Sequence, residues 1–171
     1  YWAGHGLTRM EKNQPVRYLI PYDGDPTKPD TLIAMDELYA WLKNLGAGDV
    51  ILVVDGAFAS PSSSGRSLTT RYEQQKIPHE DPATALPDFD GLFQMIASAP
   101  GQSALEFDQV KHGIFSYFFL EGVKGDIPAA DQEGTSDGKV TIREALQYAQ
   151  RKVRDLTEPM GAAQSPMLTV G

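Results

Sequence analysis

The sequence predicts an α/β fold in which helices pack on a mostly parallel sheet, and three observations lead to that class. Short apolar runs rich in β-branched residues alternate with segments of helical periodicity. The run Val50–Val54 is continuous rather than alternating, which is typical of a strand buried on both faces of a parallel sheet. Of the 171 residues, 41% are apolar and 22% are charged, as in ordinary globular proteins. We expect one domain.

The first third of the chain predicts a strand end, an apolar stretch, a helix and a central strand. Tyr1–Ala3 is interpreted as the end of a strand, and 16–21 as a short apolar stretch. A helix is predicted from apolar residues spaced as i, i+3, i+4 and i+7, namely Leu38, Trp41, Leu42 and Leu45. Gly46 and Gly48 should end this helix before the strand at 50–54 begins.

The rest of the chain predicts two more strands, two helices and two loops. Strands are expected at 92–97 and 166–170, and helices at about 113–124 and 141–156. Thr141 and Glu144 form a capping-box pattern at the start of the second helix. The segment at about 59–90 is rich in Ser, Pro, Gly and charges without periodicity, so we expect a long mobile loop there. Residues 125–139 are interpreted as another polar loop.

Charge and composition exclude several function classes. The net charge of −8 argues against a nucleic-acid partner, because proteins that bind nucleic acid usually carry excess positive charge. No apolar run reaches the roughly 20 residues of a membrane helix, so no membrane partner is expected. The chain has no cysteine, which excludes disulfides and thiolate zinc sites and suits a cytoplasmic location. No cofactor and no metal are expected.

Two predicted strands run directly into short segments with chemically useful residues. His5 stands between two glycines, and Asp55 ends the apolar run. Catalytic and ligand-binding groups of open α/β sheets gather at the carboxyl ends of strands, and histidine is the usual general base. Taken singly, however, His5 could belong to an ordinary turn, and Asp55 could be a helix cap or a turn former.

Together, the two segments resemble the caspase-like cysteine peptidases, nearer to the bacterial and metacaspase branch than to the animal caspases. That family carries a Tyr-Ser-Gly-His-Gly-like block and, later, an Asp-x-Cys-x-Ser-Gly-like block. Here the blocks are Tyr1-Trp2-Ala3-Gly4-His5-Gly6 and Asp55-Gly56-Ala57-Phe58-Ala59-Ser60. His5 precedes position 57 by about 50 residues, as the caspase histidine precedes its cysteine. Four further segments are similar to the family and extend the resemblance over most of the chain: 18–23, 93–100, 112–117 and 164–166.

The resemblance implies a caspase-like three-layer α/β/α sandwich with a mostly parallel sheet. It also implies that residues 1–171 are the C-terminal part of a single peptidase domain, whose N-terminal strands lie outside this chain. Such a part would expose a sheet edge, so we expect it not to be stable alone. The N-terminal fragment or an activating protein is therefore an expected partner, beside a polypeptide substrate.

One departure from the family pattern is central, because alanine occupies the nucleophile position. Ala57 has no nucleophilic atom, so the chain as written cannot form an acyl-enzyme. Two explanations are open: the cysteine was replaced to hold the enzyme inactive, or it was lost in nature while the fold was kept. The intact His5, its two glycines and Asp55 favour replacement.

For the parental enzyme, the resemblance implies a cysteine endopeptidase cleaving after Arg or Lys. A thiolate at position 57 would attack the scissile carbonyl, and His5 would protonate the leaving amine. The backbone N–H groups of Gly6 and residue 57 would stabilise the oxyanion. Asp55 would line the S1 pocket and pair with a basic P1 side chain. Alternatively, Asp55 only orders the turn.

The long predicted loop suggests activation by cleavage. Arg66 and Arg71 lie in it soon after the nucleophile position and would be natural cut sites for an enzyme of basic specificity, with Lys76 nearby. Alternatively, these are ordinary solvated charges. His79 and His112 are expected to be structural or solvated rather than catalytic.

A calcium site is not expected, although one loop comes close to the pattern. The segment 133–144 has Asp137, Gly138 and Glu144 at calcium-loop spacing, but Glu rather than Asp at its first position. Glu144 also serves better as the capping-box residue.

Two other function classes stay open at this stage. One is a naturally inactive caspase-like scaffold or regulatory module. The other is an unrelated ligand-binding α/β domain, which would require His5 and Asp55 to lie far from each other and from position 57.

Overall fold

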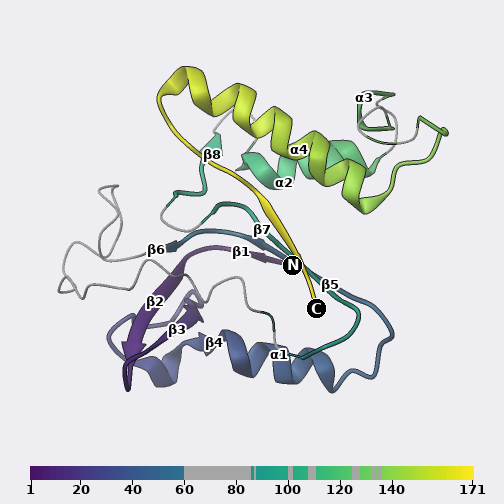
Figure 1. The fold of residues 1–171 in the computed structure, drawn as a ribbon. Helices are drawn as coiled ribbons and strands as arrows, with labels where there is room; N and C mark the ends of the chain where they lie inside the picture. The colour runs from purple at the N-terminus through teal and green to yellow at the C-terminus, as the bar shows by residue number, and fades with distance from the viewer. Residues whose placement is uncertain are drawn as a thin grey trace.

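A computed structural model of the chain describes residues 1–59, 86, 88–99, 102–107, 111–124, 128–131, 134 and 136–171. It confirms the α/β class with a mostly parallel sheet. Figure 1 shows helix α1 below the central sheet and helices α2 and α4 above it. The sheet is therefore covered from both sides.

The central sheet has the strand order β1-β5-β7-β10, where β1 is Trp2–Ala3, β5 Val50–Asp55, β7 Leu92–Ile96 and β10 Met167–Val170. The first three strands are parallel and β10 is antiparallel to β7. All four strands were predicted. Burial of β5 on both faces is only partly confirmed, because Ile51 is 48% exposed. Ile51 and Val53 lie on the same face of β5, and the helices above the sheet cover Val53 but leave Ile51 uncovered.

A second sheet, not predicted from the sequence, has the order β4-β3-β2-β6. Its strands are β2 (Gly6–Glu11), β3 (Gln14–Leu19), β4 (Ile33–Ala34) and β6 (Phe58–Ala59). β2 and β3 form an antiparallel hairpin, whereas β6 pairs in parallel with β2. The second sheet matters for function, because it ties the segment after His5 to the segment after Ala57.

A separate two-stranded antiparallel sheet pairs β8 (Glu106–Phe107) with β9 (His112–Gly113).

The helices follow the predicted periodicity, with one addition. α1 spans Met35–Lys43, α2 Ile114–Val123, α3 Pro128–Asp131 and α4 Ile142–Thr157, and the 3-10 helices η1 and η4 span Pro29–Thr31 and Glu158–Met160. The helix α3 corrects the prediction of an uninterrupted loop at 125–139; it begins at a proline, whose fixed φ suits a first helical turn. The predicted capping box of α4 is confirmed in both halves.

Two apolar clusters hold the layers together. Below the sheet, α1 packs on the strands through residues including Leu19, Met35, Tyr39, Leu52, Val54 and Ile96. Above it, α2 and α4 pack through residues including Met95, Ile114, Phe115, Leu146 and Val153. Gly122 lets the two helices approach closely, because a Cβ there would lie 3.0 Å from the Cα of Ala145. The carboxyl ends of β1 and β5 are thus held between two packed layers.

Several predictions fall outside the described residues. The long mobile loop predicted at about 59–90 lies mostly in 60–85 and 87, together with Arg66, Arg71, Lys76 and His79. Among the residues that the structure does describe, no helix has the length and apolar character needed to span a membrane.

Candidate functional site

The backbone brings the two candidate segments together at one end of the central sheet. The N–H of Gly4 donates to the carbonyl oxygen of Asp55 at 3.1 Å, and the N–H of Gly6 donates to that of Ala57, also at 3.1 Å. The register places Ala3 beside Asp55. His5 lies between the two bonded glycines, so its backbone is held beside position 57. This contradicts the ligand-binding alternative, which required these residues to lie far apart.

Gly56 is a site residue that the sequence analysis did not single out. A Cβ at residue 56 would overlap the carbonyl oxygen of Gly4. The two segments can therefore approach this closely only with glycine at position 56. The sequence offers the glycine beside Asp55 as a signal, but nothing in it identifies the backbone that Gly56 faces.

His5 is solvent-exposed at the end of β1, as predicted. Its carbonyl oxygen accepts a hydrogen bond of 3.0 Å from the N–H of Ile20, at the end of the β2–β3 hairpin. The backbone that carries the imidazole is thus held on both sides. The flanking glycines bond to Asp55 and Ala57 on one side, and Ile20 bonds to His5 on the other. An exposed imidazole on a fixed backbone can exchange protons with a group bound at this edge.

The predicted oxyanion role of Gly6 does not fit this arrangement. Its N–H already donates to the carbonyl oxygen of Ala57, within the parallel pairing of β2 with β6. The ring of Phe58 also fills the space where a Gly6 side chain would stand. Gly6 therefore joins the two segments through its backbone rather than presenting its N–H to a substrate.

Asp55 lies at the carboxyl end of β5 and turns its side chain toward the start of α2. The residue is 7% exposed, and its carboxylate occupies the space over Gly113. Burial raises the pKa of Asp55 above its ordinary value. Hydrogen bonds from the hydroxyl and the N–H of Ser116 lower this pKa, but by less than burial raises it. Glu106 raises this pKa further and His112 lowers it.

One oxygen of this carboxylate is left without a hydrogen-bond partner. Oδ2 of Asp55 is buried and has no partner among the described residues. Across the same helix start, the hydroxyl of Ser116 lies 3.0 Å from that of Tyr1. An unpaired buried carboxylate oxygen is costly, and a cation beside it would remove that cost. The carboxylate is nearly closed to solvent, so a cation could reach it only by displacing the groups that cover it.

No local sequence pattern points to a role for Ser116 or Glu106. His112 and Ser116 belong to the segment 112–117, whose resemblance to the family placed it at a helix start but indicated no contact with Asp55. Their proximity to Asp55 arises from the packing of α2 on the sheet. His112 is exposed, as was expected of a solvated histidine.

Glu144, the last residue of the possible metal loop, caps helix α4. Oε2 of Glu144 accepts hydrogen bonds from the N–H of Thr141 at 2.7 Å and from its hydroxyl at 2.8 Å. Within the described ranges, no group of three or more His, Cys, Asp or Glu side chains is placed to hold a metal ion. A cavity of about 300 Å³ lies at the end of α4, lined by residues such as Gln150, Arg154 and Gln164. No residue of the candidate site lines it.

Comparison of the chain with models of protein families and with curated proteins gave no match. The function is therefore inferred from the residues and geometry of the site itself.

Proposed function

We propose that this chain is the catalytic region of a caspase-like cysteine endopeptidase that cleaves after Arg or Lys, present here with alanine at the nucleophile position. The observation that carries the proposal is the pair of backbone hydrogen bonds, Gly4 to Asp55 and Gly6 to Ala57, which hold the histidine segment beside position 57. The central sheet, with α1 on one face and α2 and α4 on the other, is compatible with a three-layer sandwich of this family (Figure 1).

With cysteine at position 57, the chemistry is acyl transfer in two steps. The thiolate attacks the scissile carbonyl carbon, and the C–N bond breaks as His5 gives a proton to the leaving amine. Water, deprotonated by His5, then attacks the thioester carbon and releases the acid and the thiol. The N–H of residue 57 is the proposed oxyanion donor, since that of Gly6 is already paired.

Asp55 is the basis for the proposed preference for a basic P1 residue. Once the groups that cover it are displaced, its buried and partly unpaired carboxylate is the acceptor that a guanidinium or an ammonium group would bind. Arg can bind a carboxylate in a bidentate manner, so Arg should exceed Lys. Acidic P1 residues should be rejected, because they would place a second negative charge beside Asp55 and Glu106.

A second candidate is favoured by one residue, Ala57 itself. If the natural gene encodes a non-cysteine at this position, the fold would serve as a scaffold or regulatory module. The natural codon for position 57 separates the two candidates directly. Activation by cleavage at Arg66 or Arg71, or by a protein partner, is part of the peptidase proposal.

The test restores cysteine at position 57 in the full-length protein. Peptides that differ only at P1, carrying Arg, Lys, Asp or Ala, are then assayed for cleavage. We expect cleavage after Arg and Lys that is lost in His5→Ala, and a loss of P1 discrimination in Asp55→Ala. Cleavage after Asp would refute the role of Asp55. No cleavage of any peptide, with and without prior cleavage of the loop after position 59, would favour the scaffold.

A further inference from the structure

Arg17 is a half-buried cation that the proposed mechanism does not use. It lies on β3 opposite Thr8 of β2, and its guanidinium carbon is 5.1 Å from the centre of the Phe58 ring. Phe58 directly follows position 57, and its ring packs over Gly6. The guanidinium therefore contacts the segment that carries the nucleophile position.

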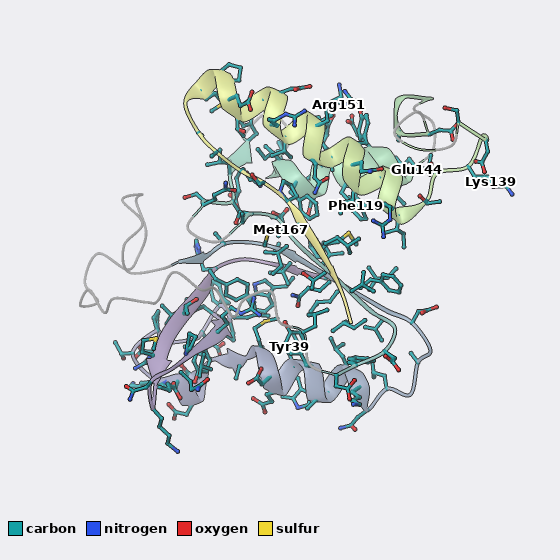
Figure 2. The ribbon with its side chains drawn as sticks, viewed as in Figure 1. Tyr39, Phe119, Lys139, Glu144, Arg151 and Met167 are labelled. Atoms are coloured by element: carbon teal, nitrogen blue, oxygen red, sulfur yellow. The ribbon has the colours of Figure 1, made fainter. Side chains whose placement is uncertain are left out.

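The positive charge of Arg17 is not neutralised by a carboxylate within the described part of the chain. No ion pair is formed there by Arg17, and its Nη1 atom is buried without an acceptor. Its polar contact is with the hydroxyl of Tyr39. That hydroxyl in turn donates to Oε1 of Gln94 at 2.6 Å. Figure 2 shows Tyr39 rising from α1 toward the sheet. The guanidinium is therefore held through a side chain of α1.

A half-buried charge without a counter-ion is costly, and it also acts over a longer range than a paired one. Asp55, the acid nearest in sequence to position 57, turns toward α2 on the opposite face of the sheet. Phe58, by contrast, packs in the cluster on the α1 side, where Arg17 stacks on it. The guanidinium thus lies against the residue that follows position 57, on the side of the sheet away from the carboxylate of Asp55.

The geometry points to Arg17 as a positioning residue for the nucleophile at position 57, which it serves by holding Phe58 and by placing an unneutralised positive charge beside the site. This inference rests on the proposed function, since it requires a thiol at that position. A nearby cation stabilises the thiolate and lowers the pKa of the thiol. The other titratable groups near position 57 are His5 after β1 and Asp55 on β5, while Tyr39 and Asp36 on α1 lie near the guanidinium of Arg17 and near Tyr39, respectively.

The experiment measures the pKa of the thiol in the full-length protein with cysteine at position 57. The rate of alkylation by iodoacetamide is followed against pH, which reports the thiolate without requiring peptidase activity. Arg17→Met should raise the thiol pKa by about one unit and slow alkylation at neutral pH roughly tenfold. Arg17→Lys, which keeps the charge, should restore most of the rate.

Arg9→Met is the matched control. Arg9 lies on the adjacent strand of the same hairpin and donates to the carbonyl oxygen of Pro26 at 3.4 Å, so its loss should leave the thiol pKa unchanged. If Arg17→Met does not fold, Arg17→Gln decides instead, since it removes the charge but keeps a donor for Tyr39.

An unchanged thiol pKa in the uncharged Arg17 variant would overturn the inference, as would an equal rise in Arg17→Lys. The peptide assay separates this failure from that of the proposed function. If the protein cleaves Arg peptides but its thiol pKa does not change when Arg17 is replaced, the inference about Arg17 is refuted and the peptidase proposal stands. A thiol that responds to Arg17 in a protein that cleaves nothing refutes the peptidase proposal alone.

Discussion

Replacing Gly113 with alanine tests the placement of Asp55 without any need for activity. The three heavy atoms nearest to a Cβ built at Gly113 all belong to the carboxyl group of Asp55. The overlap cannot be relieved by moving one oxygen, so the carboxyl group must leave its position. The φ of −58° at Gly113 is acceptable to alanine, so the backbone itself adds no strain.

The expected cost follows from the overlap itself. The added methyl group forces Asp55 out of a filled position, and inserting a methyl group into a packed site costs about 1–3 kcal/mol. Gly113→Ala should therefore lower the free energy of unfolding of the full-length Ala57 protein by roughly 1–3 kcal/mol. In an Asp55→Ala background, the same change should cost less than about 0.5 kcal/mol, because nothing remains to be displaced.

Urea unfolding of the two single variants and the double variant measures this coupling. Gly48→Ala is the control for glycine replacement, since a Cβ there meets no atom within 4 Å. It should be neutral or stabilising by about 0.4–1 kcal/mol. Equal costs of Gly113→Ala in both backgrounds would refute the placement of Asp55 over the start of α2.

Three further predictions concern the site and its support. Gly56→Ala should destabilise the fold and, with cysteine at position 57, abolish cleavage, since its Cβ would overlap the carbonyl oxygen of Gly4; cleavage at the parental rate would contradict the close approach of the two segments. Thr141→Ala should lower the free energy of unfolding by about 1 kcal/mol through loss of the capping box, as measured by urea unfolding; no change would mean that the cap is not formed in solution. The raised pKa of Asp55 means that the folded state holds this proton more tightly than the unfolded state. Its contribution to stability should be full below the ordinary Asp pKa of 3.8 and be lost as the pH rises through the folded-state pKa. Asp55→Asn should remove that part of the pH dependence of unfolding, and an unaltered profile would contradict the burial of the carboxylate.

The parts of the fold that the sequence predicted are those with a continuous local pattern. The apolar run at 50–54 and the spaced apolar residues of α1 need no knowledge of distant segments. The capping box of α4 is likewise contained within four residues. Local propensity and periodicity are sufficient for such elements.

The second sheet could not be predicted in the same way. The hairpin of β2 and β3 turns at Lys12 and Asn13, both of which have positive φ, at 49° and 65°. Lysine is uncommon in that conformation, so the usual glycine signal of such a turn is missing. The strand β6 has two residues, and its existence depends on pairing with β2.

The candidate site also has features that local sequence predicts and features that depend on tertiary packing. Local sequence placed His5 and Asp55 at strand ends, and their approach follows from the parallel pairing of β1 with β5. The burial of Asp55 against Gly113 and Ser116 joins segments far apart in the chain, so only tertiary packing could reveal it. The engagement of the Gly6 N–H also depends on the pairing of β6, and for that reason the predicted oxyanion role was not supported.

The most direct test of the peptidase proposal is covalent capture of the restored nucleophile. Full-length protein with cysteine at position 57 is treated with a thiol-directed ketone probe carrying Arg at P1, and in parallel with the same probe carrying Asp. The adduct is then located by peptide mass spectrometry. The proposal predicts an adduct at position 57 with the Arg probe, little with the Asp probe, and none in His5→Ala. A folded protein whose thiol reacts with iodoacetamide but with neither probe would contradict it.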